Sequence, residues 1–399
     1  MRIIWILNGA GLAAGGISGG LLRLHEISRR WAKRVDGQVL LTTTGSKETF
    51  DRMNSPLDTY ILPASLILKK EPFLAFKIYS YIVTAMASKL RASQLPVGDV
   101  IITNSEYFCD IIPVIQMKRK NPQAKWIAHI HHFVLHPRVR PGNPLVNWLM
   151  YFINVWGLNM VARYADSVWT YDTDVGDFIT EKLLLKGMQT SQIRRNMKNG
   201  IEHKYVPAQE IPKLVDAVLV GVRPNKGMYD IVPVWKEVQR LRPGTTLRLM
   251  GNMVNTKLLE NDILEAGLDT VIFISKNSGS MDAPTYYKTL KEARIMFAPS
   301  REEGWGIAVC EAMACGLPVV GHDLPVYKRI YGDSFIKIPV GDTAAFAANI
   351  CKILDSKVEF ESFQKKGLDC AKQYDWDSVA DEDWAYLNAA ISNENRSNL

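Results

Sequence analysis

Two glutamates and two glycines lie together in residues 299–321, which read PSREEGWGIAVCEAMACGLPVVG. Glu303 and Glu311 are eight residues apart, and Gly304 and Gly306 follow the first of them. A strand pattern precedes the glycines and a short helix pattern follows them. Glycines let a ligand approach the backbone closely, and the free N–H groups at a helix N-terminus favour phosphate. Two carboxylates at most about 12 Å apart along a helix could then bind hydroxyls of two sugars at the ends of a diphosphate.

The pattern of apolar residues predicts the elements that would position this segment. Short apolar runs without polar alternation suit strands buried on both faces of a parallel sheet, and they alternate with longer segments at helical spacing. This repetition predicts an α/β fold with right-handed crossovers. The expected strands are residues 3–7, 38–42, 100–103, 126–130, 167–170, 217–220, 246–250, 271–274, 295–298, 318–320 and 335–338.

The 399 residues are too many for one core, because single cores stop growing at about 250–300 residues. The strand–helix cycle occurs twice, and turn signals at Asn199-Gly200 and Pro207 separate the two sets. We therefore expect two doubly wound, Rossmann-like domains facing a central cleft, with residues 1–205 in the first and a second domain starting at residue 206. Ligands of such sheets bind at the carboxyl ends of the strands.

The net charge of +7 is unevenly distributed along the chain. Residues 1–200 contain 25 Lys and Arg against 14 Asp and Glu, whereas the remaining residues contain 23 against 27. A basic first domain suits an anionic partner, namely nucleic acid, a phosphorylated substrate or an acidic membrane surface, although surface charge also serves solubility. The content of 47% apolar and 22% charged residues indicates a soluble globular protein and excludes a disordered or fibrous one.

Cysteine and histidine are present without a clear metal-binding pattern. The five cysteines form no C-x-x-C pair, which argues against a disulfide framework and favours a reducing compartment. Four of the seven histidines lie in WIAHIHHFVLHP, where alternate residues of a strand would share one face. Because no carboxylate lies in that segment, we expect no metal there.

The first apolar run of the sequence, residues 3–7, is too short for the apolar core of a signal peptide.

The segment 299–321 resembles the signature of the retaining glycosyltransferases of family four, which have the GT-B fold. The family pattern is P-S-x-x-E-g-F-G, then four residues, then E-A-m-A-x-G-x-P-V-v, and Trp305 replaces the usual Phe. Residues 216–238 resemble the opening strand and loop of the second domain. The aromatic-rich tail resembles the final helix of the family. The resemblance therefore implies that the second domain covers residues 206–375 and that residues 376–399 return to the first domain.

The resemblance also implies a donor-binding site in the second domain. Lys226 would hold the donor diphosphate, and so would Arg223, although Arg223 lies two residues after Gly221 instead of one and could be a solvated turn residue. Glu303 would bind the sugar hydroxyls, and Glu311 would bind the ribose of the nucleotide. The backbone around Gly304, Trp305 and Gly306 would complete this site.

In the first domain, the resemblance points to a glycine-rich stretch and one histidine. Gly16, with its neighbour Gly15, matches a family Gly-Gly near the donor phosphate or the acceptor, and Gly19-Gly20 is the alternative. His131 aligns with a histidine near the donor sugar, and its alternative role is a strand-end histidine bonded to the backbone.

The implied reaction transfers a sugar from a UDP- or GDP-linked donor to a hydroxyl, with retention of the anomeric configuration. The family is metal-independent, uses no cofactor, and is held to react by front-face displacement. The acceptor could be a lipid-linked glycan or a precursor of a cell-envelope polysaccharide, and no nucleic acid partner is expected. Two rivals remain: a non-catalytic, sugar-nucleotide-binding subunit of a transferase complex, and a sugar-nucleotide epimerase with the same fold.

Residues 141–162, PGNPLVNWLMYFINVWGLNMVA, contain no charged residue. Their length suits a membrane span, but four asparagines argue against one, since unpaired amides are costly in hydrocarbon. Trp148, Tyr151 and Trp156 suit a membrane interface or a protein contact. A helix buried under the first sheet, peripheral contact with an anionic membrane, and an oligomer interface all remain open. We expect a cytoplasmic protein, with the inner face of the membrane as the alternative location.

Overall fold

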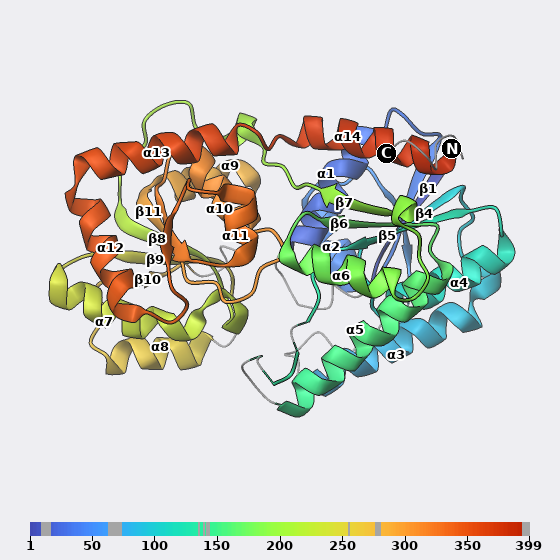
Figure 1. Cartoon of the computed structure of the whole chain (residues 1–399), viewed down its shortest axis with the longest axis horizontal. Coiled ribbons are helices and arrows are strands. Elements are labelled where there is room, and N and C mark those ends of the chain that lie inside the picture. Colours follow the sequence, from blue (N-terminus) through green and yellow to red (C-terminus); the bar gives the residue numbers. More distant parts are fainter. Residues whose placement is uncertain are drawn as a thin grey trace. The chain divides into compact units, whose positions relative to one another are not determined.

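The computed structural model describes residues 1–8, 17–62, 74–134, 136–138, 140, 144–253, 256–275 and 281–392 (Figure 1). The chain divides into two compact units. Unit 1 comprises Met1–Lys198 and Asp377–Leu399, and unit 2 comprises Asn199–Trp376. The boundary after Lys198 lies a few residues before residue 206, where the sequence predicts the start of the second domain. It coincides with the turn signal at Asn199.

Unit 1 is built on a parallel sheet with the strand order β3-β2-β1-β4-β5-β6-β7. The central strand β1 pairs with β2 and β4, so that Trp5 lies between Leu40 and Ile102. Its strands are β1 (Arg2–Leu7), β2 (Gly37–Thr42), β3 (Asp58–Ile61), β4 (Val100–Thr103), β5 (Lys125–Ile130), β6 (Ser167–Tyr171) and β7 (Ile193–Met197). Its helices are α1 (Gly19–Trp31), α2 (Thr44–Arg52), α3 (Leu74–Leu90), α4 (Phe108–Lys120), α5 (Pro144–Tyr164) and α6 (Asp174–Leu184).

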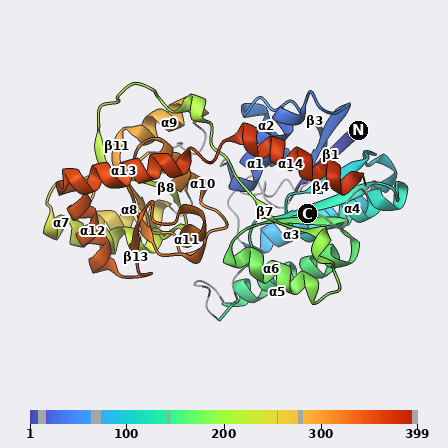
Figure 2. The ribbon, with the colours of Figure 1, turned by 45° about the horizontal axis from the view of Figure 1, so that its top comes forward.

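The C-terminal helix α14 (Trp376–Ile391) packs on unit 1, beside α1 (Figure 2). The indole of Trp31 donates to the Ala380 carbonyl at 3.0 Å, and the buried carboxylate of Asp383 pairs with Arg23 and Arg194. The described part of α14 brings four acidic side chains to unit 1. The charge difference between the two units is therefore smaller than the difference between the two halves of the sequence.

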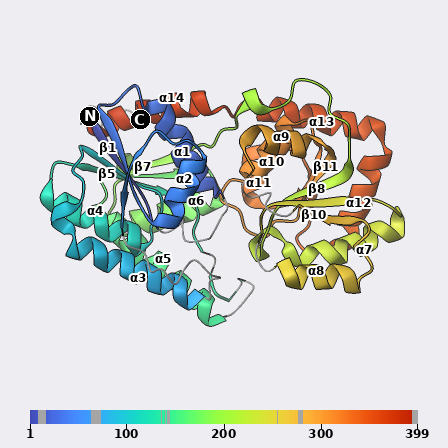
Figure 3. The ribbon, with the colours of Figure 1, turned by 180° about the vertical axis from the view of Figure 1, so that it is seen from behind.

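Unit 2 is built on a second parallel sheet, with the order β10-β9-β8-β11-β12-β13 (Figure 3). Its strands are β8 (Val215–Val222), β9 (Leu247–Met253), β10 (Ile272–Ile274), β11 (Ala293–Ala298), β12 (Val319–His322) and β13 (Ile336–Ile338). Its helices are α7 (Ile231–Leu241), α8 (Thr256–Glu265), α9 (Ala283–Lys291), α10 (Ile307–Ala314), α11 (Pro325–Tyr331), α12 (Thr343–Asp355) and α13 (Lys357–Ala371). Fully buried side chains of β8, β9 and β11 form its core with α7 and α12.

Each of the eleven expected strands is present, with ends that differ by a few residues. Strands β3 and β7 were not expected from the sequence. They are the two edges of the unit 1 sheet, with the sequences DTYI and IRRNM. An edge strand is covered less completely than a central one, so it needs no continuous apolar run and gives little signal.

Candidate functional site

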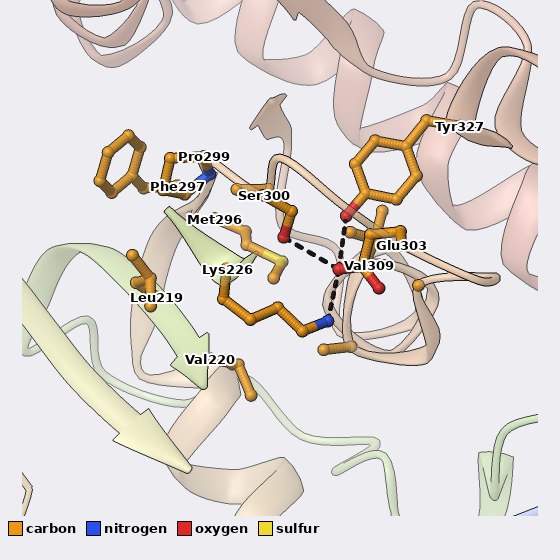
Figure 4. Close-up of a pocket in the computed structure, with 13 residues that line it drawn as sticks. Leu219, Val220, Lys226, Met296, Phe297, Pro299, Ser300, Glu303, Val309 and Tyr327 are labelled. Atoms are coloured by element: carbon orange, nitrogen blue, oxygen red, sulfur yellow. Dashed lines mark hydrogen bonds and ion pairs between the residues drawn. The ribbon is translucent and has the colours of Figure 1, made fainter. Parts of the chain in front are cut away.

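Glu303 lies in the loop between β11 and α10, and three side chains donate to one of its carboxylate oxygens (Figure 4). Ser300 Oγ lies 2.9 Å and Tyr327 Oη 3.1 Å from Oε1, and the ammonium of Lys226 pairs with the same atom. The second oxygen, Oε2, accepts no hydrogen bond from the described residues. Burial alone would raise the pKa of Glu303, but Lys226 and the two hydroxyl donors outweigh it and lower that pKa. The carboxylate is therefore ionised, with one oxygen left for a ligand.

The backbone around Gly227 explains how Lys226 reaches this loop. Gly227 has φ +78°, and a Cβ at this position would lie 2.1 Å from the Pro299 carbonyl oxygen. Beside it, the Asn225 carbonyl accepts the Arg301 N–H at 2.9 Å. Only glycine permits both the left-handed conformation and this close approach. The Lys-Gly pair thus joins the loop after β8 to the loop after β11.

Arg223 provides a second cation near Glu303. It is half-buried at the end of β8, and its Nε has no hydrogen-bond partner among the described residues. Burial lowers the pKa of Arg223, while the Glu303 carboxylate acts in the opposite direction. An unpaired guanidinium in a half-buried place is costly unless an anion joins it.

Gly306 directly precedes α10 and lines the same pocket as Glu303. Its φ is +90°, and a Cβ there would lie 2.6 Å from the Tyr327 ring. Lys226, Ser300, Glu303, Gly306 and Tyr327 all line this pocket. The free N–H groups at the start of α10 add a partial positive charge to the two cations.

Trp305 and Gly304 occupy the same loop as Glu303. The indole of Trp305 is buried, with its ring centroid 5.7 Å from that of Tyr331 and 5.0 Å from that of Tyr374. Only its backbone is thus placed to contact a donor. Gly304 is half-buried between Glu303 and this packed indole.

Glu311 lies on α10 and is held by two tyrosines of α9. Tyr286 donates to Oε2 at 2.7 Å, and Tyr287 donates to Oε1 at 3.4 Å. Burial raises the pKa of Glu311 to about 7, although both tyrosine hydrogen bonds act in the opposite direction. Glu311 does not line the pocket that contains Glu303. The two tyrosines could not be found from the sequence, because their contact with α10 depends on the packing of α9 and no motif marks them.

In unit 1, His131 follows β5, and both of its ring nitrogens are engaged. Nδ1 lies 2.8 Å from Tyr171 Oη, and Nε2 lies 2.8 Å from Asn104 Oδ1. An amide oxygen only accepts, so Nε2 carries the hydrogen and Nδ1 accepts from the Tyr171 hydroxyl. Burial, and then the Arg23 guanidinium, lower the pKa of His131 to about 3, so the ring is neutral.

Of the two glycine pairs near the N-terminus, the structure describes only Gly19-Gly20. Gly15 and Gly16 lie outside the described residues. Gly20 belongs to the first turn of α1, and a Cβ there would lie 2.8 Å from Asn104 Nδ2. That amide nitrogen is buried and has no partner among the described residues, so it is a free donor beside His131.

The other three histidines of the WIAHIHHFVLHP segment are separated in the fold. His129 is buried and stacks on Trp169, with ring centroids 5.1 Å apart, whereas His136 lies at the surface against Trp148. His132 is half-buried near Glu106. The described residues contain no group of three or more His, Cys, Asp or Glu that could hold a metal ion. All five cysteines are described, buried and free.

Comparison with protein families finds a match within unit 2. Residues 217–368 match the family described as glycosyl transferases group 1, and this range contains Arg223, Lys226, Glu303 and Glu311. A phosphatidyl-myo-inositol mannosyltransferase from Mycobacterium leprae is 33% identical over 107 residues, which are 26% of this chain and 29% of that protein. For the curated relatives the matched part covers between 25% and 53% of their length.

Solved structures resemble the whole chain. A sucrose-phosphate synthase from Thermosynechococcus elongatus has a TM-score of 0.76 at 16% identity, over 98% of this chain and all of that one. HepE from Anabaena, solved in complex with UDP and glucose, has a TM-score of 0.71 at 15% identity, with the same coverage. The chain therefore has the GT-B fold, and its residues 217–368 match the group 1 glycosyl transferases.

Proposed function

We propose that this chain is a retaining glycosyltransferase of family four, which moves a sugar from a nucleotide diphosphate sugar to a hydroxyl acceptor. The observation that carries the proposal is the ion pair of Lys226 with Glu303, whose Oε2 accepts no hydrogen bond from the described residues. Arg223 adds a second cation, and its Nε has no hydrogen-bond partner among those residues. The site thus offers two positive charges for a diphosphate and a carboxylate oxygen for sugar hydroxyls. The names of several relatives, and the UDP bound to HepE, support this class of substrate.

The proposed roles are those that the resemblance implies. Arg223, Lys226 and the N–H groups around Gly306 hold the diphosphate and stabilise its negative charge as it departs. Glu303 accepts hydroxyls of the sugar, and Glu311 accepts hydroxyls of the ribose. When the donor binds, the Lys226 ammonium is shared between Glu303 and a phosphate oxygen.

The proposed step is a displacement on one face of the sugar. The bond from the anomeric carbon to the phosphate oxygen breaks, and the bond to the acceptor oxygen forms on the same face. The acceptor proton moves to the departing phosphate oxygen. Two observations support a mechanism without a protein nucleophile: Glu303 is held in an ion pair, and both ring nitrogens of His131 are already bonded. The proposal includes neither a metal nor a cofactor.

The first experiment measures donor binding. Thermal shifts of the full chain with UDP, GDP and their sugars should show stabilisation by the matching nucleotide, about 2.7 kcal/mol at one hundred times its Kd. Lys226→Ala and Arg223→Ala should each abolish most of that shift. Lys357→Ala is the matched control, because the side chain of this lysine is 87% exposed and it lies on α13, outside the pocket that contains Glu303. Equal shifts in all three variants would contradict the assignment.

The second experiment separates the proposed enzyme from its rivals. The full chain is incubated in excess EDTA with the donor and a panel of hydroxyl acceptors. The panel includes lipid-linked glycans and polysaccharide precursors. NMR of the product should show the anomeric configuration of the donor. Inversion would exclude the retaining mechanism, and activity that returns only with magnesium or manganese would exclude the metal-free site. Conversion of the donor without acceptor would indicate an epimerase, and tight binding without turnover would indicate a binding subunit.

A further inference from the structure

Helix α5 exposes large apolar side chains on the side that faces away from the core of unit 1. Leu145 is 81%, Phe152 58% and Trp156 39% exposed, and Trp148 and Leu149 are also exposed. Steps of three and four residues keep these five side chains on one side of the helix. The outer side of a surface helix is ordinarily polar or charged, so this arrangement is the reverse of the usual one.

The inner side of α5 is occupied by the core, so the helix cannot turn its outer side inward. Leu158 and Val161 are buried with the side chains of β4, β5 and α4. A Cβ at Gly157 would lie 1.9 Å from the Glu106 carbonyl oxygen, which shows how closely the helix approaches that loop. The outer aromatic rings also contact each other, since Trp148 and Phe152 stack with centroids 5.5 Å apart.

Helix α3 has the same reversed pattern. Its last turns expose Ile82, Met86 and Leu90, while Thr84 and Ser88 are buried. Helix α4 contacts both α3 and α5, and the views show α3 and α5 on the same side of the unit 1 sheet (Figures 1 and 2). We call the exposed apolar residues of these two helices the α3–α5 face: Ile82, Met86, Leu90, Leu145, Trp148, Leu149, Phe152 and Trp156.

The segments that carry this face contain no acidic residue. The sequence has 41 Asp and Glu in 399 residues, yet none lies in residues 111–165 or in residues 72–98. The described basic side chains of these segments include Lys89, Arg91 and Arg163, all exposed, and the Arg163 guanidinium lies 5.2 Å from the ring of Tyr164. The face is therefore apolar and aromatic, with basic side chains and no acidic side chain in its own segments.

We propose that the α3–α5 face binds the surface of a lipid bilayer that contains anionic headgroups. Tryptophan and other aromatic rings insert at the level of the headgroups, while nearby Lys and Arg attract the negative surface. No described helix is long and apolar enough to cross a membrane, so α5 lies along the interface. A second copy of this chain is a poor occupant, because it would bring the same positive charge to the contact. This inference does not depend on the proposed glycosyl transfer.

The test is sedimentation of the full chain with vesicles of phosphatidylcholine, alone or mixed with phosphatidylglycerol, at low and high salt. The wild type should bind the mixed vesicles at low salt and be released only in part at high salt, because salt screens charge and not apolar burial. Arg163→Gln should weaken binding about fivefold at low salt and hardly at high salt. The triple variant Trp148→Ser, Phe152→Ser, Trp156→Ser should lose the salt-resistant part, a reduction of about tenfold or more.

Leu258→Ser with Leu264→Ser is the matched control, because both side chains are about two-thirds exposed on α8 of unit 2. The control should bind as the wild type does, and all variants should keep the melting temperature of the wild type. The proposal is overturned if the wild type ignores anionic vesicles at low salt, or if the control loses as much binding as the triple variant. A wild-type dimer in light scattering that only the triple variant dissociates would instead make this face an interface between copies.

Discussion

The ammonium of Lys226 and Oε1 of Glu303 form an ion pair inside unit 2, although 77 residues separate them in the chain. Ser300 and Tyr327 donate to the same oxygen, so the three donors leave Oε2 without a hydrogen bond from the described residues (Figure 4). A carboxylate held in this way keeps its charge and its position before any ligand arrives, which reduces the cost of ordering the site.

Substitution of the two signature glutamates should have different kinetic effects. Glu303→Gln should chiefly lower kcat, because a sugar held by Glu303 must be positioned at the reacting carbon. Glu311→Gln should chiefly raise the donor KM, by about tenfold for each 1.4 kcal/mol of lost binding. The exposed Glu265→Gln on α8 is the control for both. Equal losses of kcat with an unchanged donor KM would refute these roles.

Donor binding should depend on pH through Glu311, whose pKa is raised by burial to about 7. Below this pH the carboxyl is protonated, and above it the carboxylate can accept charge-assisted hydrogen bonds from the ribose. The donor KM should therefore fall as the pH rises through about 7. Glu311→Gln should remove this dependence.

Tyr286→Phe should move that dependence to higher pH, because the Tyr286 hydrogen bond lowers the pKa of Glu311. The same raised pKa means that Glu311 lowers the free energy of unfolding as the pH rises from its unfolded value of 4.5 through about 7. Tyr229→Phe, at an exposed tyrosine of unit 2, should leave the profile in place. An unmoved profile in Tyr286→Phe would show that another group titrates.

The value of kcat should depend on the orientation of the His131 ring more than on its charge. Tyr171→Phe removes the hydrogen bond to Nδ1, so the ring is held only by Asn104 and kcat should fall while the donor KM changes little. Because the pKa of His131 is about 3, the kcat profile between pH 6 and about 9 should keep its shape in this variant. A change in that shape would mean that His131 exchanges a proton during turnover.

The stability of unit 1 should depend on one buried aspartate of α14. Asp383→Ala leaves Arg23 and Arg194 without their shared buried partner, so it should cost about 3–5 kcal/mol of unfolding free energy. Asp381→Ala on the same helix removes only an exposed pair with Arg34 and should cost less than about 1 kcal/mol. Urea unfolding followed by tryptophan fluorescence compares the two. Similar midpoints would show that the buried pair adds no net stability.

The parallel strands and the signature loop could be predicted from local patterns in the sequence. Strands buried on both faces require continuous apolar runs, and this requirement acts within a few neighbouring residues. The loop after β11 could be recognised because Glu303, Gly304 and Gly306 lie close together in the chain. Edge strands β3 and β7 escaped detection because partial exposure removes that local requirement.

Contacts between residues that are far apart in the sequence depend on the tertiary structure. Trp305 follows Glu303 directly in the chain, yet its indole packs against Tyr331 and Tyr374. Tyr286 reaches Glu311 through the packing of α9 on α10. Such contacts depend on how whole elements pack, and the residue pattern of a single element does not contain that information.

The packing of whole elements also determines which side chains of residues 141–162 are exposed and how the charges of the chain are paired. The uncharged sequence left a buried helix, a membrane contact and an interface open. The fold shows that α5 is half-buried, with its largest apolar side chains outside. The acidic tail belonged to the second half of the sequence, but α14 places Asp383 against the arginines of unit 1. Composition records which charges a chain carries, and the fold determines which of them remain unpaired.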